Sequence, residues 1–315
     1  MFLGIDGGGS KTSCLIGDET SVLGAGTGGA SNVVRVGEAQ ARESLATAIH
    51  QACTVANIKP SEISSVCVGL AGAARPEIGE LVRGIISEVI SGEIKPDEIN
   101  VVGDMVIALE AAFGNGPGVI VIAGTGSIAY GRDREGQTAR AGGWGFAISD
   151  EGSGHWIGRR AISAILSAHD QGLETTLCAM VLQAWKLNTL DELVQQANST
   201  PPPDFPRLFP IVLRAADEDD SVARSLLTDA GAKLGSLAAI VVHRLAHNTP
   251  AAMLTGSMLP VATLPVAMTG SVFRQSPDVR RVFYNTLQTS LPGIDVRQDI
   301  VDPIEGALAR ARAPH

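Results

Sequence analysis

The chain opens with two short apolar runs around a glycine-rich turn. Residues 2–5 are mostly apolar and end at Asp6, three glycines follow at positions 7–9, and residues 14–16 are apolar again. Two such runs around a glycine turn predict a β-hairpin. A hairpin turn needs only one or two glycines. Three in a row therefore indicate a backbone that a ligand must approach closely.

The pattern continues as alternating strands and helices up to a turn cluster at residues 114–118. Strands are predicted at 21–25, 64–70 and 99–102, and helices at 38–56, 76–90 and 106–113. The stretch 26–32, rich in glycine and small polar residues, is expected to be a flexible loop. The predicted order of this half is βββαβαβα.

The same pattern restarts after the turn cluster. Strands are predicted at 119–123, 128–131, 138–141, 266–269 and 294–297, and helices at 278–291 and 304–312. Between them lies a helical insertion with helices expected at 156–168, 175–185, 190–196 and 221–247, and a proline-rich surface loop at 199–210. The repeat predicts an internal duplication. We expect an α/β protein of two lobes, 1–116 and 117–302, with a ligand cleft between them.

Composition narrows the class of protein. The chain has 315 residues, 45% of them apolar and 4% aromatic, so the cores should be aliphatic. The net charge of −9 without a basic cluster argues against nucleic acid and against an anionic membrane as partners. We found neither an uninterrupted apolar run of membrane-spanning length nor a signal peptide, and the four scattered cysteines lack metal-site spacing. A cytoplasmic protein is expected.

The glycine turn is a candidate phosphate loop. Gly7, Gly8 and Gly9, with Ser10, Lys11 and Thr12, could wrap phosphate oxygens, and Asp6 could hold the hydrated Mg²⁺ of a nucleotide. The Walker spacing is missing, and an ordinary glycine-rich hairpin is the alternative on this stretch alone. A second loop, Gly124, Thr125, Gly126 and Ser127, stands at the equivalent point of the repeat. Two matching loops favour polyphosphate binding over two unrelated turns.

Asp104 follows a predicted strand and precedes a predicted helix. It could be the N-cap of that helix, for which aspartate is favoured. It could also be a general base that accepts a hydroxyl proton, and the two roles are compatible. The paired glycine loops favour the base.

Residues 142–156 alternate glycines with aromatic and polar residues. Asp150 or Glu151 could cap the helix that follows, or Asp150 could accept hydrogen bonds from sugar hydroxyls. Trp144 could belong to the core or form a stacking surface. Thr269–Ser271 ends a strand before a helix and could hold a nucleoside, although Thr255–Ser257 is a near copy.

Together these motifs resemble the BadF/BadG/BcrA/BcrD ATPase family of the actin-like ATPase superfamily, and within it the N-acetylglucosamine kinases. The resemblance runs from Gly4 to about Ala309 and is most specific at 6–10, 30–32, 104, 124–127 and 143–153. It implies a duplicated actin-like (RNase H-like) fold, with the N-terminal lobe completed by the C-terminal helix 303–315. It also implies a homodimer.

The resemblance assigns site residues. Asp104 would be the catalytic base. Nucleotide contacts would come from Asp6 (to Mg²⁺ through water), Gly7–Thr12, Gly124, Thr125, Gly126, Ala216, Gly270 and Ser271; sugar contacts from Asn32, Asp104, Ser127, Gly143, Trp144, Gly145 and Asp150. Two positions depart from the pattern of the animal N-acetylglucosamine kinases. This chain has Val34 where those kinases have an aromatic residue, and Ile128 where they have asparagine. Both departures lie at the expected sugar contacts.

The expected function is an ATP-dependent kinase that phosphorylates the 6-hydroxyl of an amino sugar, N-acetylglucosamine before glucosamine. ATP and Mg²⁺ are the expected cofactors. The family also contains ATPase activators that hold an iron–sulfur cluster through cysteines, but residues 119–160 contain no cysteine. A sugar-sensing regulator without catalysis is a third possibility, and it would have no need of Asp104.

Overall fold

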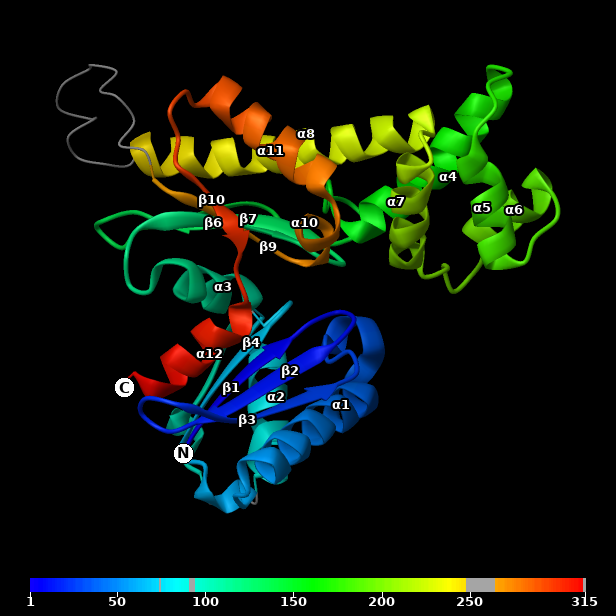
Figure 1. The fold of residues 1–315 in the computed structure, drawn as a ribbon. Coiled ribbons are helices and arrows are strands. Elements are labelled where there is room, and N and C mark those ends of the chain that lie inside the picture. The colour runs from blue at the N-terminus through cyan, green and yellow to red at the C-terminus, as the bar shows by residue number, and fades with distance from the viewer. Residues whose placement is uncertain (74, 91–93, 248–263, 314–315) are drawn as a thin grey trace. The chain divides into compact units, whose positions relative to one another are not determined.

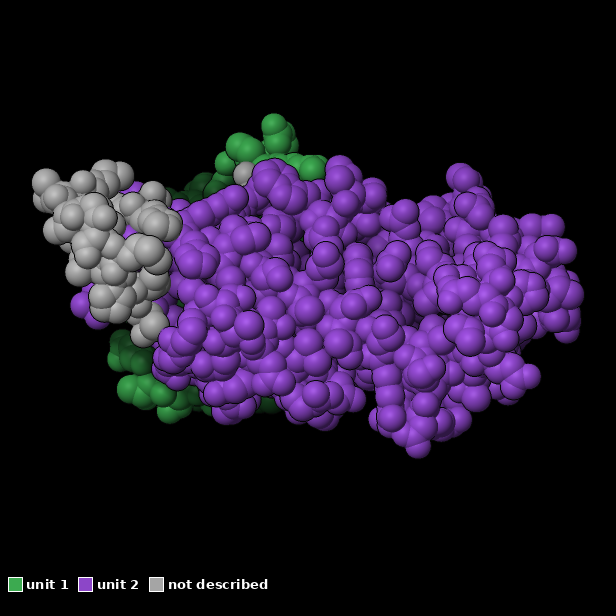
Figure 2. All heavy atoms as spheres, turned by 90° about the horizontal axis from the view of Figure 1, so that it is seen from above, with its two compact units in different colours: residues 1–120, 301–315 green, residues 121–300 purple. Residues whose placement is uncertain are grey.

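The computed structural model describes residues 1–73, 75–90, 94–247 and 264–313. The chain forms two compact units, residues 1–120 with 301–315, and residues 121–300; they are coloured separately in Figure 2. The sequence placed the division after residue 116 and again after residue 302. The C-terminal helix belongs to the first unit.

The first unit contains a five-stranded sheet in the order β3-β2-β1-β4-β5. Strand β1 pairs antiparallel with β2 and parallel with β4, and β4 pairs parallel with β5. The strands are β1 (Phe2–Gly7), β2 (Thr12–Gly17), β3 (Val22–Gly28), β4 (Ser65–Leu70) and β5 (Ile99–Gly103). The predicted hairpin is confirmed.

Helices cover both faces of this sheet (Figure 1). Helices α1 (Val33–Ala56) and α2 (Pro76–Val89) pack on the face that carries Leu3 and Ile5. Helices α3 (Asp104–Phe113) and α12 (Pro303–Arg312) pack on the other face. Alternate residues of β1 point to opposite faces, and both faces are covered, so the strand is apolar or glycine from Phe2 to Ile5. Two 3₁₀ turns, Pro60–Glu62 and Pro96–Glu98, precede β4 and β5.

Strand β3 extends through the stretch 22–28, so the predicted flexible loop at 26–32 is wrong for its first residues. A Cβ on Gly24, Gly26 or Gly28 would lie 2.1 to 2.4 Å from a backbone oxygen of α1. These glycines recur every second residue and face carbonyl groups spaced four apart on the helix. Glycine is needed there because the helix backbone lies directly on the strand.

The second unit repeats the first sheet. Its strand order is β10-β9-β6-β7-β8. Taken from the other edge, β8-β7-β6-β9-β10, it matches the order of the first sheet, with β6 in the place of β1. The strands are β6 (Gly118–Ala123), β7 (Ser127–Arg132), β8 (Thr138–Gly142), β9 (Val266–Thr269) and β10 (Val296–Ile300). The predicted duplication is confirmed. Helix α8 (Ser221–His247) packs on β7 and β8, and α10 (Ser271–Gln275) follows β9.

Helix α11 (Pro277–Ser290) lies along α8 (Figure 1), and glycines make the close approach possible. A Cβ on Gly231 or Gly235, four residues apart on α8, would lie 2.8 Å from atoms of α11. Over Ser221–Ala246, α8 is long and apolar enough to cross a membrane by length and composition, but 56% of that apolar stretch is buried within the fold. Burial against α11 and the sheet is what a core helix requires.

The insertion contains α4 (Gly154–Asp170), α5 (Thr176–Trp185), α6 (Leu190–Ala197), a 3₁₀ turn (Phe205–Leu208) and α7 (Phe209–Asp217). Helix α7 was missed because the prolines of residues 201–210 were interpreted as a loop. Pro210 lies in the first turn of α7, where a missing N–H costs nothing.

Candidate functional site

The first unit brings the opening glycine loop and Asp104 to one edge of its sheet. In the paired strands, Gly7 lies opposite Leu70, and Leu70 lies opposite Gly103. These residues form a row across β1, β4 and β5, so the segments that follow them leave the same edge. Carboxyl ends of parallel strands are where α/β proteins bind ligands. Strands are about 4.8 Å apart, which places β5 roughly 10 Å from β1.

The glycine loop is held from behind by the segment that joins β3 to α1. The Gly8 N–H donates to the Lys11 carbonyl at 2.9 Å, and the Ser31 and Asn32 N–H groups donate to the Gly8 carbonyl at 3.2 and 3.3 Å. A Cβ at Gly7 would lie 2.7 Å from Ser31 Oγ. The loop is therefore fixed in place before any ligand arrives.

Thr12 supports this loop from inside the protein. Its side chain is fully buried, and its Oγ1 lies 2.7 Å from both the Gly29 carbonyl and Ser31 Oγ. Its hydroxyl thus contacts protein atoms, whereas Ser10 and Lys11 are exposed and can reach a ligand. The sequence analysis did not predict a role for Ser31, although Ser31 lies beside Asn32 in the motif of residues 30–32.

Asp104 is the first residue of α3, and Gly103 is the N-cap, so the predicted N-cap role of Asp104 is wrong by one position. Its Oδ1 accepts a hydrogen bond from the Met105 N–H at 3.0 Å. Burial raises the pKa of Asp104, although this hydrogen bond opposes the rise. A carboxylate with a raised pKa is a stronger proton acceptor, as a general base requires.

Asn32 is the N-cap of helix α1, which begins at Val33, five residues before the predicted start. Its side-chain oxygen accepts a hydrogen bond from the Val34 N–H at 3.1 Å. Gly37, with φ of 79° and ψ of 166°, interrupts the helix after its first turn. Gly37 directly precedes residue 38, which explains why the sequence predicted a helix that starts there.

In the second unit, three contacts tie the second glycine loop to residues 151–155. The Gly154 N–H donates to the Gly124 carbonyl at 2.8 Å, and the His155 N–H donates to the Thr125 carbonyl at 3.2 Å. Ser127 Oγ donates to the Glu151 carbonyl at 2.8 Å. Two motifs that are separate in the sequence therefore form one surface.

Asp150 lies at the centre of this surface. It is 6% exposed and has a positive φ of 65°, which is uncommon for a residue other than glycine. Its Oδ1 accepts a hydrogen bond from the Gly145 N–H at 3.3 Å, and its Oδ2 would be 2.7 Å from a Cβ at Gly126. Strained buried residues gather at functional sites. The alternative, that Asp150 or Glu151 caps α4, is wrong because Ser153 is the N-cap.

Trp144 is 66% exposed, which excludes the predicted alternative that it belongs to the core. The guanidinium carbon of Arg140 lies 4.3 Å from the centre of its ring. Beside it, Gly143 lies on the Ile128 side chain: a Cβ at Gly143 would be 2.6 Å from Ile128 Cδ1. Arg140 was missed by sequence reasoning, and its only signal was a basic residue on the strand that leads into this loop.

Gly270 lies against the second glycine loop. It has φ of 105°, and a Cβ there would be 2.3 Å from the Ala123 carbonyl oxygen. Ser271, exposed, begins α10. Thr255–Ser257, the rival segment, lies outside the described residues. Ala216 is buried on α7, and its carbonyl accepts hydrogen bonds from Arg224 Nε and the Asp219 N–H.

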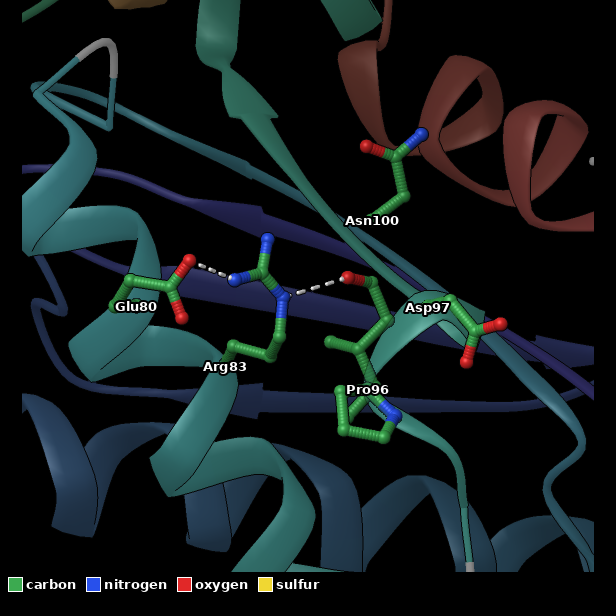
Figure 3. A pocket seen from close by; sticks show the side chains of 6 residues that line it. Glu80, Arg83, Pro96, Asp97 and Asn100 are labelled. Carbon is green, nitrogen blue, oxygen red and sulfur yellow. Dashed lines mark hydrogen bonds and ion pairs between the residues drawn. The ribbon is translucent and has the colours of Figure 1, made fainter.

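An open pocket of about 620 Å³ lies at the other end of β5 (Figure 3). Arg83 of α2 donates to the Ile99 carbonyl at 3.2 Å and pairs with Glu80 at 2.5 Å. Ile99 begins β5 and Asp104 follows its end. At about 3.3 Å per residue, this pocket is roughly 16 Å from Asp104 and is separate from the candidate site.

A metal cage made by the protein is not part of this site. In the ranges that the structure describes, no three His, Cys, Asp or Glu side chains gather as metal ligands. A carboxylate near the end of a strand, such as Asp6, fits Mg²⁺ that arrives with a nucleotide and keeps most of its waters.

Comparison with known proteins gives matches along most of the chain. The model of the BadF/BadG/BcrA/BcrD ATPase family matches residues 3–310. An N-acetylmuramic acid/N-acetylglucosamine kinase of Clostridium acetobutylicum is 35% identical over 80% of this chain and 83% of its own. The glucosamine kinase GspK of Vibrio cholerae is 29% identical over 78% and 82%.

A solved structure shares the fold across the whole chain. A provisionally named N-acetylglucosamine kinase from Chromobacterium violaceum has a TM-score of 0.73 and 26% identity, with 98% of each chain covered. Together with the two matching sheets, this likeness confirms the predicted duplicated α/β fold of the actin-like kinases.

Proposed function

From the premise that the chain belongs to the BadF/BadG/BcrA/BcrD ATPase family, we propose that it is an ATP-dependent amino-sugar kinase. The preferred substrate is N-acetylglucosamine, and the acceptor is its 6-hydroxyl group. The relatives named for N-acetylglucosamine and glucosamine phosphorylation support this proposal. A cytoplasmic location goes with ATP as the donor.

One observation carries the proposal. Asp104 and the glycine loop follow strands that end at the same edge of the sheet, and burial raises the pKa of Asp104. ATP supplies the phosphoryl group. Asp104 accepts a hydrogen bond from the acceptor hydroxyl, orients its oxygen and takes its proton. Phosphoryl transfer passes through a loose transition state, so positioning and charge stabilisation provide most of the catalysis.

We assign the nucleotide to the two glycine loops. Backbone N–H groups of rigid glycine turns bind phosphate oxygens without reorganisation. Asp6 holds Mg²⁺ through water. The remaining nucleotide residues are Gly7–Ser10, Lys11, Gly124–Gly126, Ala216, Gly270 and Ser271, with Thr12 in a supporting role.

We assign the sugar to Asn32, Asp104, Ser127, Gly143–Gly145 and Asp150. The buried carboxylate of Asp150, beside Gly126, supports the assignment because sugar hydroxyls are strong donors to carboxylates. The exposed ring of Trp144 gives the sugar an apolar surface.

Glucosamine is the second candidate substrate, favoured by the likeness to the glucosamine kinase. An acetamido group needs an apolar wall for its methyl group, whereas a protonated amine needs a carboxylate and water. Ile128, packed on Gly143, provides apolar surface near the assigned sugar residues. This contact favours the acetylated sugar.

The experiment is a coupled ADP-release assay with N-acetylglucosamine, glucosamine, glucose and no sugar. We expect the highest kcat/KM with N-acetylglucosamine and little release without sugar. A glucosamine value tenfold above that for N-acetylglucosamine would reverse the substrate order. ADP release that no sugar stimulates would contradict a kinase and favour an ATPase.

A further inference from the structure

Arg140 and Trp144 form a stacked pair beside the residues assigned to the sugar. Arg140 is a partly buried residue of β8, and its guanidinium carbon lies 4.3 Å from the centre of the Trp144 ring. Trp144 is nevertheless 66% exposed. Because the guanidinium covers one face of the ring, most of that exposure belongs to the opposite face, which is open to a ligand.

The backbone around Trp144 gives the ring little support of its own. Gly143 and Gly145, on either side of it, have positive φ angles of 68° and 103°, and glycine is the residue with the greatest backbone freedom. The strand that carries Arg140 is better fixed, because Arg244 of α8 donates to the Arg140 carbonyl at 2.6 Å. Arg140 therefore anchors the exposed ring to the sheet.

The same surface carries two carboxylates. Asp150 accepts a hydrogen bond from the Gly145 N–H at 3.3 Å, and the side chain of Glu151 accepts one from Ser149 Oγ at 3.0 Å. Carboxylates attract a protonated amine, and so does the face of an indole ring. With these groups alone, the surface would favour glucosamine over the acetylated sugar.

The charge of Arg140 opposes that preference. Within the part of the chain that the structure describes, the ion pairs of arginines do not include Arg140. A group stacked on the open face of Trp144 would be roughly 8 Å from the guanidinium, with about 4 Å on each side of the ring. At that distance a second positive charge is disfavoured about threefold to tenfold. A neutral acetamido group is not.

We propose that Arg140 is a positioning residue that selects the acetylated sugar. It holds Trp144 as a wall for the acetamido group, and its charge excludes the ammonium group of glucosamine. The inference rests on the proposed function and names the residue that decides its substrate. The acetamido methyl packs on the ring, since this group needs an apolar surface. Ile128 and Arg140 then favour the same sugar, one by contact and the other by charge.

The test measures kcat and KM for N-acetylglucosamine and for glucosamine at about pH 6.5, where an amine of this kind is mostly protonated. The proteins are the wild type, Arg140→Gln, Arg140→Lys and the control Arg134→Gln. Arg134 is exposed in the turn that precedes β8, so its substitution makes the same change of charge away from Trp144.

We expect Arg140→Gln to lower the ratio of kcat/KM for N-acetylglucosamine to that for glucosamine at least about tenfold. The KM for N-acetylglucosamine should rise because the ring loses its anchor, and the KM for glucosamine should fall because the repulsion is gone. The kcat for N-acetylglucosamine should stay within about threefold, since the proton acceptor is unchanged. Arg140→Lys should still exclude glucosamine, because it keeps the charge. Arg134→Gln should change neither sugar.

A double-mutant cycle tests whether Arg140 acts through Trp144. In a Trp144→Ala protein, Arg140→Gln should no longer raise the KM for N-acetylglucosamine, because the ring that Arg140 positions is absent. The fall in KM for glucosamine should persist, because the charge acts without the ring. Melting temperatures of all the variants show that each is folded.

The wild type provides a test that needs no variant. As pH rises above about 8, the amine of glucosamine loses its proton. Its KM should then fall if Arg140 decides the selection, and should rise if Asp150 and Glu151 decide it. The KM for N-acetylglucosamine, which has no such proton, is the control.

Three results would overturn the inference and leave the kinase standing. Equal losses of kcat/KM for both sugars in Arg140→Gln would make Arg140 structural. An unchanged KM for glucosamine in that variant would refute the exclusion of the ammonium group. A KM that rises for ATP alone would make Arg140 a nucleotide contact. If the wild type phosphorylates neither sugar, the proposed function fails and the inference fails with it.

Discussion

Asp104 shows how one residue can serve activity at a cost in stability. Burial raises its pKa, so the ionised form is disfavoured in the folded protein. Hydrogen bonds from the backbone N–H groups of Met105 and of Asp104 itself partly offset this effect. A group whose pKa is raised by folding makes the folded state more stable as pH falls through the raised value, and less stable above it. The ionised carboxylate that a base requires is therefore the less stable form.

Replacing Asp104 by Asn should separate the two properties. Asparagine keeps an oxygen for the Met105 N–H and removes the buried charge, so the melting temperature at pH 7 should be unchanged or higher. Turnover should fall by about two to four orders of magnitude, the usual contribution of a general base, while the Kd for sugar and for ATP stays within about tenfold. Near-normal turnover would refute the base.

The pH profile of the wild type tests the same residue independently. Turnover should decline as pH falls through a pKa above the ordinary value of 3.8. The kcat profile of the slow Asp104→Asn enzyme should lack that step. A step that persists in the variant would belong to another group.

Residue types alone could predict Asp104, Asp150 and the glycine loops as candidate site residues, because carboxylates and consecutive glycines have a characteristic chemistry. They could not show that Trp144 is exposed or that Thr12 is buried. Exposure depends on what the folded chain places next to a residue, and one aromatic residue among glycines suits either environment. Arg140 was missed for the same reason.

At the scale of elements, the sequence predicted strands and helices correctly where the apolar periodicity was regular. The prediction failed where the close packing of one backbone on another determines which element forms. Gly26 and Gly28 looked like loop residues, yet they let α1 lie on β3. Pro210 looked like a loop residue, yet it lies in the first turn of α7. Glycine and proline have different meanings in different tertiary contacts, and those contacts are absent from a local pattern.

Asp220, the last residue of the acidic run 217–220, joins helices α5 and α8. It is 7% exposed. Its Oδ2 accepts from Thr175 Oγ1 and the Thr176 N–H at 2.7 Å each, and its Oδ1 accepts from the Ala223 N–H at 2.9 Å. One carboxylate thus caps the first turns of both α5 and α8.

Asp220→Asn should destabilise the protein by about 2 to 3 kcal/mol, since it turns an acceptor oxygen toward donors into an amide and removes charge-assisted hydrogen bonds. Asp217→Asn, an exposed change of the same charge three residues earlier, is the control and should have little effect. Urea unfolding followed by far-UV circular dichroism measures both.

The stabilising effect of Asp220 also has a defined pH window. Burial alone would raise its pKa, but hydrogen bonds from Thr175, Ala223, Leu177 and Thr176 outweigh burial and lower it. The contribution is therefore complete above the ordinary value of 3.8 and is lost as pH falls below it toward the lowered value. Equal stability of Asp220→Asn and wild type at pH 7 would show that the carboxylate is not what joins the helices.

At the scale of the whole molecule, duplication explains why the fold was predictable. Both sheets have the same strand order, and in each the glycine loop follows the strand at the centre of that order. A hairpin followed by parallel strands produces a regular pattern of apolar runs and glycine turns in the amino-acid sequence. The insertion between β8 and β9 has no counterpart in the first unit, and there the sequence missed a helix.

The last prediction uses the stability of the entire chain as the measurement. A ligand that binds only the folded protein raises its stability by RT ln(1 + [L]/Kd), about 2.7 kcal/mol at a hundredfold excess over Kd. N-acetylglucosamine should therefore raise the melting temperature, and glucose should raise it much less, because it lacks the acetamido group that Ile128 would contact. Asp104→Asn should keep most of the shift, since it removes a proton acceptor and keeps a hydrogen-bonding side chain. A clear shift with Mg-ATP and none with any sugar would contradict the kinase, because sugar binding is then missing. A sugar shift without ADP release in the coupled assay would identify a sensor that keeps the site and lacks the reaction.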